Sequence, residues 1–383
     1  MSASPSVVEL TKRLIAFDTV SRNSNLELIV FASELLSAAG ARLRLTHDAG
    51  GHKANLFASI GPECDGGYVL SGHTDVVPVD GQKWSSDPFK AEIREGNLYG
   101  RGASDMKGFI ATILALLPEF KAANLKRPLH FAFSFDEEVG CVGVRRLIDD
   151  LKTAGIKPQL AIIGEPTSMR VVAGHKGGAV METVARGREG HSSSPGRGAS
   201  AVMMTGEFIA ALSALGEELK QDRDEFFEPP YTTVQANVMS GGTAVNVLAG
   251  EARVVWETRA LPDRDQKAVF ERAKARMADI LPRYRTGAPE ADFTTHVHAE
   301  YPGLVRNVDS PAVRLACALS GNNDVHTVAF GTEAGLFQQA GIPAVVCGPG
   351  SIHVAHKADE FVELDQLDAC ATFLRRLAQR ASQ

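Results

Sequence analysis

The stretch Tyr68-Val69-Leu70-Ser71-Gly72-His73-Thr74-Asp75 decides how this chain folds. It begins as a short apolar run, which is typical of a strand in a sheet that is covered on both faces. It ends in an imidazole and a carboxylate. In an open α/β sheet, ligands bind beyond the carboxyl ends of the strands. The stretch therefore predicts a buried strand with a polar site at its end.

Other segments repeat this pattern of an apolar run followed by metal-binding side chains. Glu137 and Glu138 follow the run from Leu129 to Phe135, and Glu165 follows the run from Leu160 to Ile163. Asp105 lies in a glycine-rich loop before a predicted helix over 108–117. Each donor alone is also explained as a solvated loop side chain. Together, imidazoles and carboxylates at several strand ends favour a site for zinc or cobalt, with manganese as a further option.

Composition limits the class of protein. A chain of 383 residues suits two domains. The net charge of −6, without a basic block, argues against nucleic acid as a partner. The five cysteines are scattered, so neither a disulfide framework nor a thiolate zinc site is expected. No apolar run approaches the ~18 residues of a membrane span, and the N-terminus shows no secretory signal. We expect a cytoplasmic protein without a membrane partner.

The order of predicted elements indicates an α/β protein with an insertion. Helices and strands alternate in the first part, as in a mainly parallel sheet. Between Ala179 and His298 the order becomes β-α-β-β-α-β, which is that of a ferredoxin-like α+β fold. Alternation then returns. The sequence predicts a catalytic domain over 1–177 and 299–383, interrupted by an inserted domain over 178–298.

Several motifs follow one another in register: Gly72-His73-Thr74-Asp75-Val76-Val77-Pro78, Leu98-Tyr99-Gly100-Arg101-Gly102, Ser104-Asp105-Met106-Lys107-Gly108, Asp136-Glu137-Glu138 and Gly164-Glu165-Pro166. They resemble the dizinc amidohydrolases and metallopeptidases that include acetylornithine deacetylase, succinyl-diaminopimelate desuccinylase and aminoacylase. The resemblance spans nearly the whole chain. It implies that the inserted domain acts as a lid and joins two subunits into a homodimer.

The resemblance also implies a set of metal ligands. His73, Asp105 and Glu165 would hold one divalent cation, and Asp105, Glu138 and His356 the other, with Asp105 as the bridge. Both ions are expected to be Zn²⁺, with Co²⁺ as an alternative. In such proteins the peptide bond after the bridging aspartate is commonly cis.

One alternative concerns the last metal ligand. His353 lies close to His356 in the sequence and competes with it, although the resemblance favours His356.

Two carboxylates beside the ligands are assigned to catalysis. Asp75 is expected to accept the second ring N–H of His73, which fixes the tautomer. Glu137 is expected to act as the general base. The alternatives are that Glu137 and Glu138 exchange roles, or that Glu137 is a surface charge.

The remaining candidates concern the substrate. His191 resembles the histidine that this family lends to the partner subunit's active site, where it would hydrogen-bond the oxyanion. Arg259, with Asn246, would bind a substrate carboxylate. Glu333 would attract a substrate ammonium group. The simpler explanations are a surface loop for His191 and a helix N-terminal carboxylate for Glu333.

The motif around Glu333 is similar to that of the acetylornithine deacetylase branch. It implies hydrolysis of N2-acetylornithine to ornithine and acetate, a step of arginine biosynthesis. The alternatives are another N-acyl amino acid as substrate, as in the desuccinylase and aminoacylase branches, and a non-catalytic protein that binds amino acid derivatives. A nucleotide-binding protein is excluded because no phosphate-binding loop is present.

Overall fold

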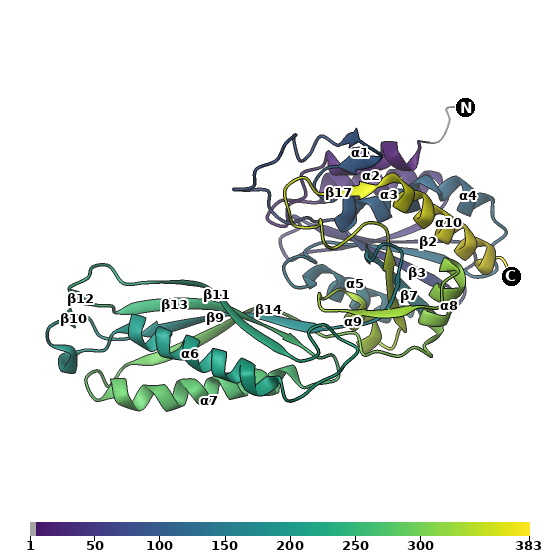
Figure 1. Ribbon diagram of the computed structural model, residues 1–383. Coiled ribbons are helices and arrows are strands. Elements are labelled where there is room, and N and C mark those ends of the chain that lie inside the picture. The colour runs from purple at the N-terminus through teal and green to yellow at the C-terminus, as the bar shows by residue number, and fades with distance from the viewer. Residues whose placement is uncertain (1–4) are drawn as a thin grey trace. The chain divides into compact units, whose positions relative to one another are not determined.

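The computed structural model describes residues 5–383. Residues 1–4 lie outside the described part. The first residues of the expected catalytic domain, and of the N-terminal stretch in which no secretory signal was found, therefore lie outside it too. The chain divides into two compact units (Figure 1). Unit 1 contains residues 5–174, Leu304–Thr327 and Thr332–Gln383, and unit 2 contains His175–Gly303 and Val328–Gly331. The predicted boundaries, 177/178 and 298/299, stay predictions of where functional domains divide.

Unit 1 is built on an eight-stranded sheet with the strand order β1-β2-β6-β3-β7-β16-β8-β15. At its centre β6, β3, β7 and β16 are parallel, whereas β1, β2 and β8 pair with their neighbours in antiparallel fashion. The predicted α/β class with a large mainly parallel sheet is confirmed, and the antiparallel edges are additional. The strands are β1 (Arg42–His47), β2 (Ala54–Ile60), β3 (Tyr68–His73), β6 (Leu129–Ser134), β7 (Leu160–Pro166), β8 (Val171–His175), β15 (Val325–Val328) and β16 (Ala344–Gly348).

Helices cover both faces of this sheet. Figure 1 shows α3 and α10 on one side and α5 and α9 on the other. Every residue of α3 up to Leu114 is buried, because this helix is packed between the sheet, α1 and α10. The helices are α1 (Val7–Ile15), α2 (Leu26–Ala38), α3 (Gly108–Ala115), α4 (Leu117–Ala122), α5 (Val142–Thr153), α8 (Pro311–Ser320), α9 (Ala334–Gln339) and α10 (Leu364–Ala381).

A small second sheet in unit 1 lies beside the segments that carry site residues. Its three strands, in the order β17-β5-β4, are β4 (Glu92–Arg94), β5 (Asn97–Tyr99) and β17 (Phe361–Glu363). Sequence analysis does not predict them, because three residues are too few for a periodic pattern. No helix within residues 5–383 is both long and apolar enough to cross a membrane.

Unit 2 is a four-stranded antiparallel sheet with two long helices. Its strand order is β11-β13-β9-β14, and the chain order β-α-β-β-α-β is the predicted one. Trp256 on β13 and Phe208 on α6 are fully buried and pack edge to face. The elements are β9 (Gly177–Arg186), β10 (Gly190–His191), η2 (Pro195–Arg197), α6 (Ala201–Leu219), β11 (Thr233–Gly241), β12 (Val247–Leu248), β13 (Glu251–Ala260), α7 (Gln266–Arg285) and β14 (Asp292–Tyr301).

Candidate metal centre

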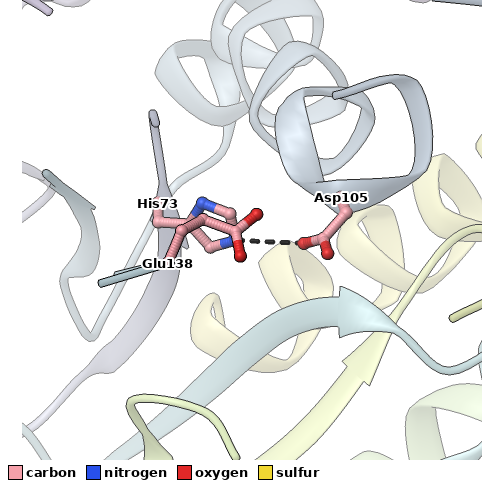
Figure 2. Close-up of side chains that lie close together, drawn as sticks. All are labelled: His73, Asp105 and Glu138. Carbon is pink, nitrogen blue, oxygen red and sulfur yellow. Dashed lines mark hydrogen bonds and ion pairs between the residues drawn. The ribbon is translucent and has the colours of Figure 1, made fainter. Parts of the chain in front are cut away.

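Five donors from distant parts of unit 1 converge at the carboxyl ends of the parallel strands. Nε2 of His73, the last residue of β3, lies 3.0 Å from one carboxylate oxygen of Asp105 and 3.8 Å from Glu165. Nε2 of His356 lies 3.1 Å from the other Asp105 oxygen and 3.1 Å from Glu138. Figure 2 shows the side chains of His73 and Asp105 meeting, with Glu138 beside them. Asp105 therefore lies between two imidazoles, where a bridging ligand belongs.

The donors fit divalent cations. Two groups of side chains lie close enough to hold an ion, one of His73, Asp105 and Glu138 and one of His73, Glu137 and Glu165. In each of Glu138 and Glu165, a buried carboxylate oxygen has no hydrogen-bond partner. Buried unpaired carboxylate oxygens are costly unless a cation neutralises them. Imidazole and carboxylate donors suit Zn²⁺ and Co²⁺. The grouping of Glu137 with Glu165 differs from the predicted ligand sets, which exclude Glu137.

The neighbouring carboxylates make this site strongly anionic. Burial raises the pKa of Glu138 and Glu165, and the Asp105 carboxylate raises both further. Hydrogen bonds to Asp105 and Glu138 raise the pKa of His356 to about 11. Burial lowers the pKa of His73, but the hydrogen bond to Asp105 and the charge of Glu165 outweigh burial and raise it well above its usual value. The carboxylates thus favour positive charge at both imidazoles, as a site for cations requires.

Asp105 lies in η1 (Ala103–Lys107), a turn in which Asp105 and Met106 have non-helical backbone angles, and the Asp105–Met106 peptide bond is cis, as the resemblance predicts. Of the two candidate histidines, His356 is the one whose ring reaches the carboxylates. His353 is exposed, and only its main-chain groups are hydrogen-bonded within the described residues.

Asp75 differs in part from expectation. The Nδ1–H of His73 donates to the main-chain carbonyl of Asp75 at 2.9 Å, while the carboxylate lies 3.7 Å away. This carboxylate instead accepts hydrogen bonds from the Ser21 hydroxyl at 2.7 Å and from the main-chain N–H groups of Glu137 at 3.1 Å and Glu138 at 3.3 Å. The tautomer of His73 is fixed by a carbonyl, and the Asp75 side chain positions the Glu137-Glu138 loop.

Glu137 is half-buried beside this cluster. Burial raises its pKa to about 8, with His73 opposing this effect and Glu138 adding to it. The thiol of Cys141 donates a hydrogen bond to its carboxylate at 3.3 Å. In the sequence, Cys141 is only one of five scattered cysteines, and nothing there marks this contact. A carboxyl with a pKa near neutrality can take up and release a proton at physiological pH.

A buried ion pair that sequence analysis leaves without a role holds the Asp105 turn. Arg101 and Glu360 are each 1% exposed, and their charges meet at 2.7 Å. Glu360 also accepts the main-chain N–H of Asp105 at 3.0 Å, together with those of Gly102 and Ser104. Gln82 accepts from Arg101 and donates to the His356 carbonyl. One network therefore supports both segments that carry the bridging carboxylate and the last histidine.

Lys53 supports the segment that carries Glu137 and Glu138. Its ammonium group is paired with Asp136 at 2.5 Å and also donates to the Ser21 carbonyl. Asp136 adopts a positive φ of 55°, so the chain turns sharply just before Glu137. Loop residues next to the donors are thus anchored by charged side chains on other elements.

Glu333 does not reach an open site. It is 1% exposed, and its two carboxylate oxygens accept from the hydroxyls of Ser71, at 3.0 Å, and Ser134. The expectation that it meets a substrate ammonium group stays a prediction. Glu333 is the residue that precedes α9, as its alternative explanation predicts. It ties the ends of β3 and β6 together beneath the donors.

The other substrate candidates lie in unit 2. His191 is exposed, and its Nδ1 accepts from the Ser193 hydroxyl at 2.7 Å. Asn246 is exposed, and its carbonyl accepts from the N–H of Ser192, so these two candidates share one loop region. Arg259 is partly buried and pairs with Glu257 at 2.9 Å and with the Tyr301 hydroxyl. The structure brings His191 and Asn246 close to each other, and Arg259 lies on β13.

Comparison with known proteins agrees with this geometry. Residues 69–380 match the family described as peptidase family M20/M25/M40. The chain is 38% identical over 379 residues to acetylornithine deacetylase of Myxococcus xanthus, which covers 97% of this chain and 96% of that protein.

Solved structures show the same fold. The M20 family metallo-carboxypeptidase Sso-CP2 of Sulfolobus solfataricus superposes with a TM-score of 0.80 at 19% identity, covering 99% of both chains. YXEP of Bacillus subtilis, described as a dinuclear metal-binding peptidase, gives a TM-score of 0.66 at 18% identity, covering 97% of this chain and 96% of that one. The chain described here therefore belongs to peptidase family M20/M25/M40 and is a hydrolase of that family.

Proposed function

We propose that this hydrolase removes the acetyl group from N2-acetylornithine, giving ornithine and acetate in arginine biosynthesis. The observation that carries the chemistry is the placement of Asp105 between His73 and His356, with Glu138 and Glu165 beside them. The substrate is supported by the near full-length similarity to a protein named acetylornithine deacetylase.

The proposed cofactor is a pair of divalent ions, Zn²⁺ with Co²⁺ as the alternative. His73, Asp105 and Glu165 would hold one, and Asp105, Glu138 and His356 the other. The unpartnered oxygens of Glu138 and Glu165 support this assignment. When bound, two such cations polarise the substrate carbonyl and lower the pKa of a water.

Glu137 is the proposed general base. Its carboxylate takes a proton from the attacking water, whose oxygen forms the new bond to the acetyl carbon. The C–N bond then breaks, and the same proton passes from Glu137 to the leaving α-amino nitrogen. The position of Glu137 beside the cluster and its raised pKa support this role.

Unit 2 is proposed to recognise the substrate and to join two subunits. Arg259 and Asn246 would bind the α-carboxylate, and His191 of the partner subunit would donate to the developing oxyanion. Exposed apolar side chains support an interface on this unit, with Val238 on the edge strand β11 60% exposed and Val245 100% exposed. A cytoplasmic location stays a prediction from the sequence.

A related substrate is the second candidate, since desuccinylases and aminoacylases share the predicted donors. The values of kcat/KM for N2-acetylornithine, N-acetylmethionine and N-succinyl-diaminopimelate separate these activities. We expect the kcat/KM for N2-acetylornithine to exceed both other values by about tenfold or more, because each competitor would lose at least one polar contact. A higher value for either competitor would overturn the assignment. A non-catalytic role is not retained, because the chain belongs to a hydrolase family.

A further inference from the structure

A cavity in unit 1 lies at the amino ends of the parallel strands, whereas the metal centre lies at their carboxyl ends. It measures about 700 Å³ and is lined by Tyr68 and Leu160, the first residues of β3 and β7. The donors His73 and Glu165 lie towards the other ends of these two strands. A molecule in this cavity would therefore not touch the reacting atoms. Its volume is within the ~300–1,000 Å³ usual for small-molecule sites.

Four arginines from three separate segments converge on this cavity. Arg127 lies just before β6, Arg314 lies on α8, and Arg376 and Arg380 lie on α10. No aspartate or glutamate side chain lines it, and its other polar side chains include the carboxamides of glutamines. The chain as a whole carries a net charge of −6. No carboxylate side chain opposes the four cations, and at most the terminal carboxylate of Gln383 does, so their convergence is unfavourable by Coulomb's law and a bound anion would reduce this cost.

The hydrogen bonds of these arginines leave their charge uncompensated. Arg127 donates to the Gln159 side-chain carbonyl at 2.6 Å, Arg376 to the Leu319 main-chain carbonyl at 2.7 Å, and Arg380 to the Gln383 side chain at 2.9 Å. All three acceptors are neutral. Within residues 5–383, Arg314 makes no side-chain hydrogen bond or ion pair. Neutral partners orient the guanidinium groups without neutralising them.

The neighbouring Arg375 shows the contrast. It precedes Arg376 on α10 but points to Glu119, with which it forms three hydrogen bonds of 2.9–3.2 Å. On the same helix, therefore, one arginine has a carboxylate partner, and two that line the cavity have none.

We propose that this cavity binds a compact polyanion, a small molecule with two or more carboxylate or phosphate groups. Guanidinium groups match both kinds of group with paired N–H donors, and the glutamine carboxamides add neutral donors. The site is separate from the proposed hydrolysis and does not depend on it.

The test is titration calorimetry on the whole metal-loaded enzyme at constant ionic strength. The probes are tricarballylate for carboxylates and fructose 1,6-bisphosphate for phosphates, with acetate as the monovalent comparison. We expect at least one polyanion to bind with a Kd below about 1 mM and to raise Tm, while acetate does neither. The stronger probe identifies the anionic group. Absence of binding by both polyanions overturns the proposal.

Two variants test whether a bound anion lies in this cavity. Arg314→Gln removes a side chain without a partner, so folding should be unaffected, and the affinity should fall about tenfold for one lost charge-assisted contact. Arg375→Gln, the matched control on α10, should bind as the wild type does. Equal binding by wild type and Arg314→Gln, or an equal loss in Arg375→Gln, means that the anion binds elsewhere and overturns the proposal. Substrate is absent throughout, so the result is independent of the assigned reaction.

Discussion

The candidate site residues of unit 1 and those of unit 2 are held in different ways. In unit 1, Asp105 and Glu138 are held by main-chain hydrogen bonds to the buried carboxylates of Glu360 and Asp75, which lie far away in the sequence. In unit 2, His191 and Asn246 are exposed, and the contacts of the His191 ring are to Ser193, two residues away. Fixed geometry is what metal binding requires, whereas groups that close over a substrate can become ordered when it binds. The difference supports the proposal that unit 1 holds the metal ions and that unit 2 binds the substrate.

The largest effect is expected for Glu137→Gln. The carboxamide keeps the shape but cannot accept the proton, so kcat should fall by about 10³-fold. Metal content, measured by elemental analysis, should not change. Glu138→Gln is the matched variant and should lose metal instead. If Glu137→Gln loses the metal and Glu138→Gln keeps it, the two residues have exchanged roles.

The next largest effect should come from unit 2. His191→Ala should lower kcat by about 10²-fold, as the loss of one oxyanion donor does, without changing metal content or Tm. His298→Ala, which removes another exposed histidine of unit 2, serves as the control. A kcat within twofold of the wild type would assign His191 to the surface and remove it as the proposed oxyanion donor.

A variant distant from the substrate tests the rigidity of unit 1. Glu360→Gln weakens the acceptor for the N–H of Asp105 and leaves Arg101 buried without its counter-ion, so metal affinity should fall by about 10–100-fold. A competition titration with a zinc chelator measures this. Glu119→Gln breaks an exposed pair with Arg375 and should leave the affinity unchanged. Equal affinities in both variants would contradict the positioning role.

The smallest effect concerns pH and metal removal. The folded-state pKa of His356, about 11, lies above its usual 6.5. In the metal-free protein, the interaction of protonated His356 with Asp105 and Glu138 stabilises the fold fully below pH 6.5. This contribution to stability declines as the pH rises towards 11. Bound cations replace the proton. Removing the metal should therefore lower Tm more at pH 8.5 than at pH 6, as measured by calorimetry, and an equal drop at both pH values would refute this account.

The parts that sequence predicts are those that a short pattern encodes. The buried strands ending at His73 and before Glu137 were predictable because apolar runs and polar ends lie side by side in the chain. The ends of longer elements differ by only a few residues, as in α3, which ends at Ala115 where the sequence predicts a helix over 108–117. The brief strands β4, β5 and β17 carry no periodic signal, so they were missed.

Contacts between a side chain and the main chain also escape prediction. The carboxylates of Asp75 and Glu360 bind N–H groups that every residue possesses, so no residue type marks the partner. The burial of Glu333 under Ser71 and Ser134 likewise depends on tertiary packing, and sequence reasoning assigned it to the substrate. The motifs located the site, whereas the supports of its ligands required coordinates.

The Asp105 turn has a consequence for how the protein is made. Its main-chain N–H is held by a carboxylate that lies 255 residues later in the chain. A ribosome has released His73, Asp105, Glu138 and Glu165 long before it adds Glu360, so the nascent polypeptide carries its donors without the anchor that arranges them. The Asp105 turn can therefore be arranged as described only after the chain has been made as far as Glu360.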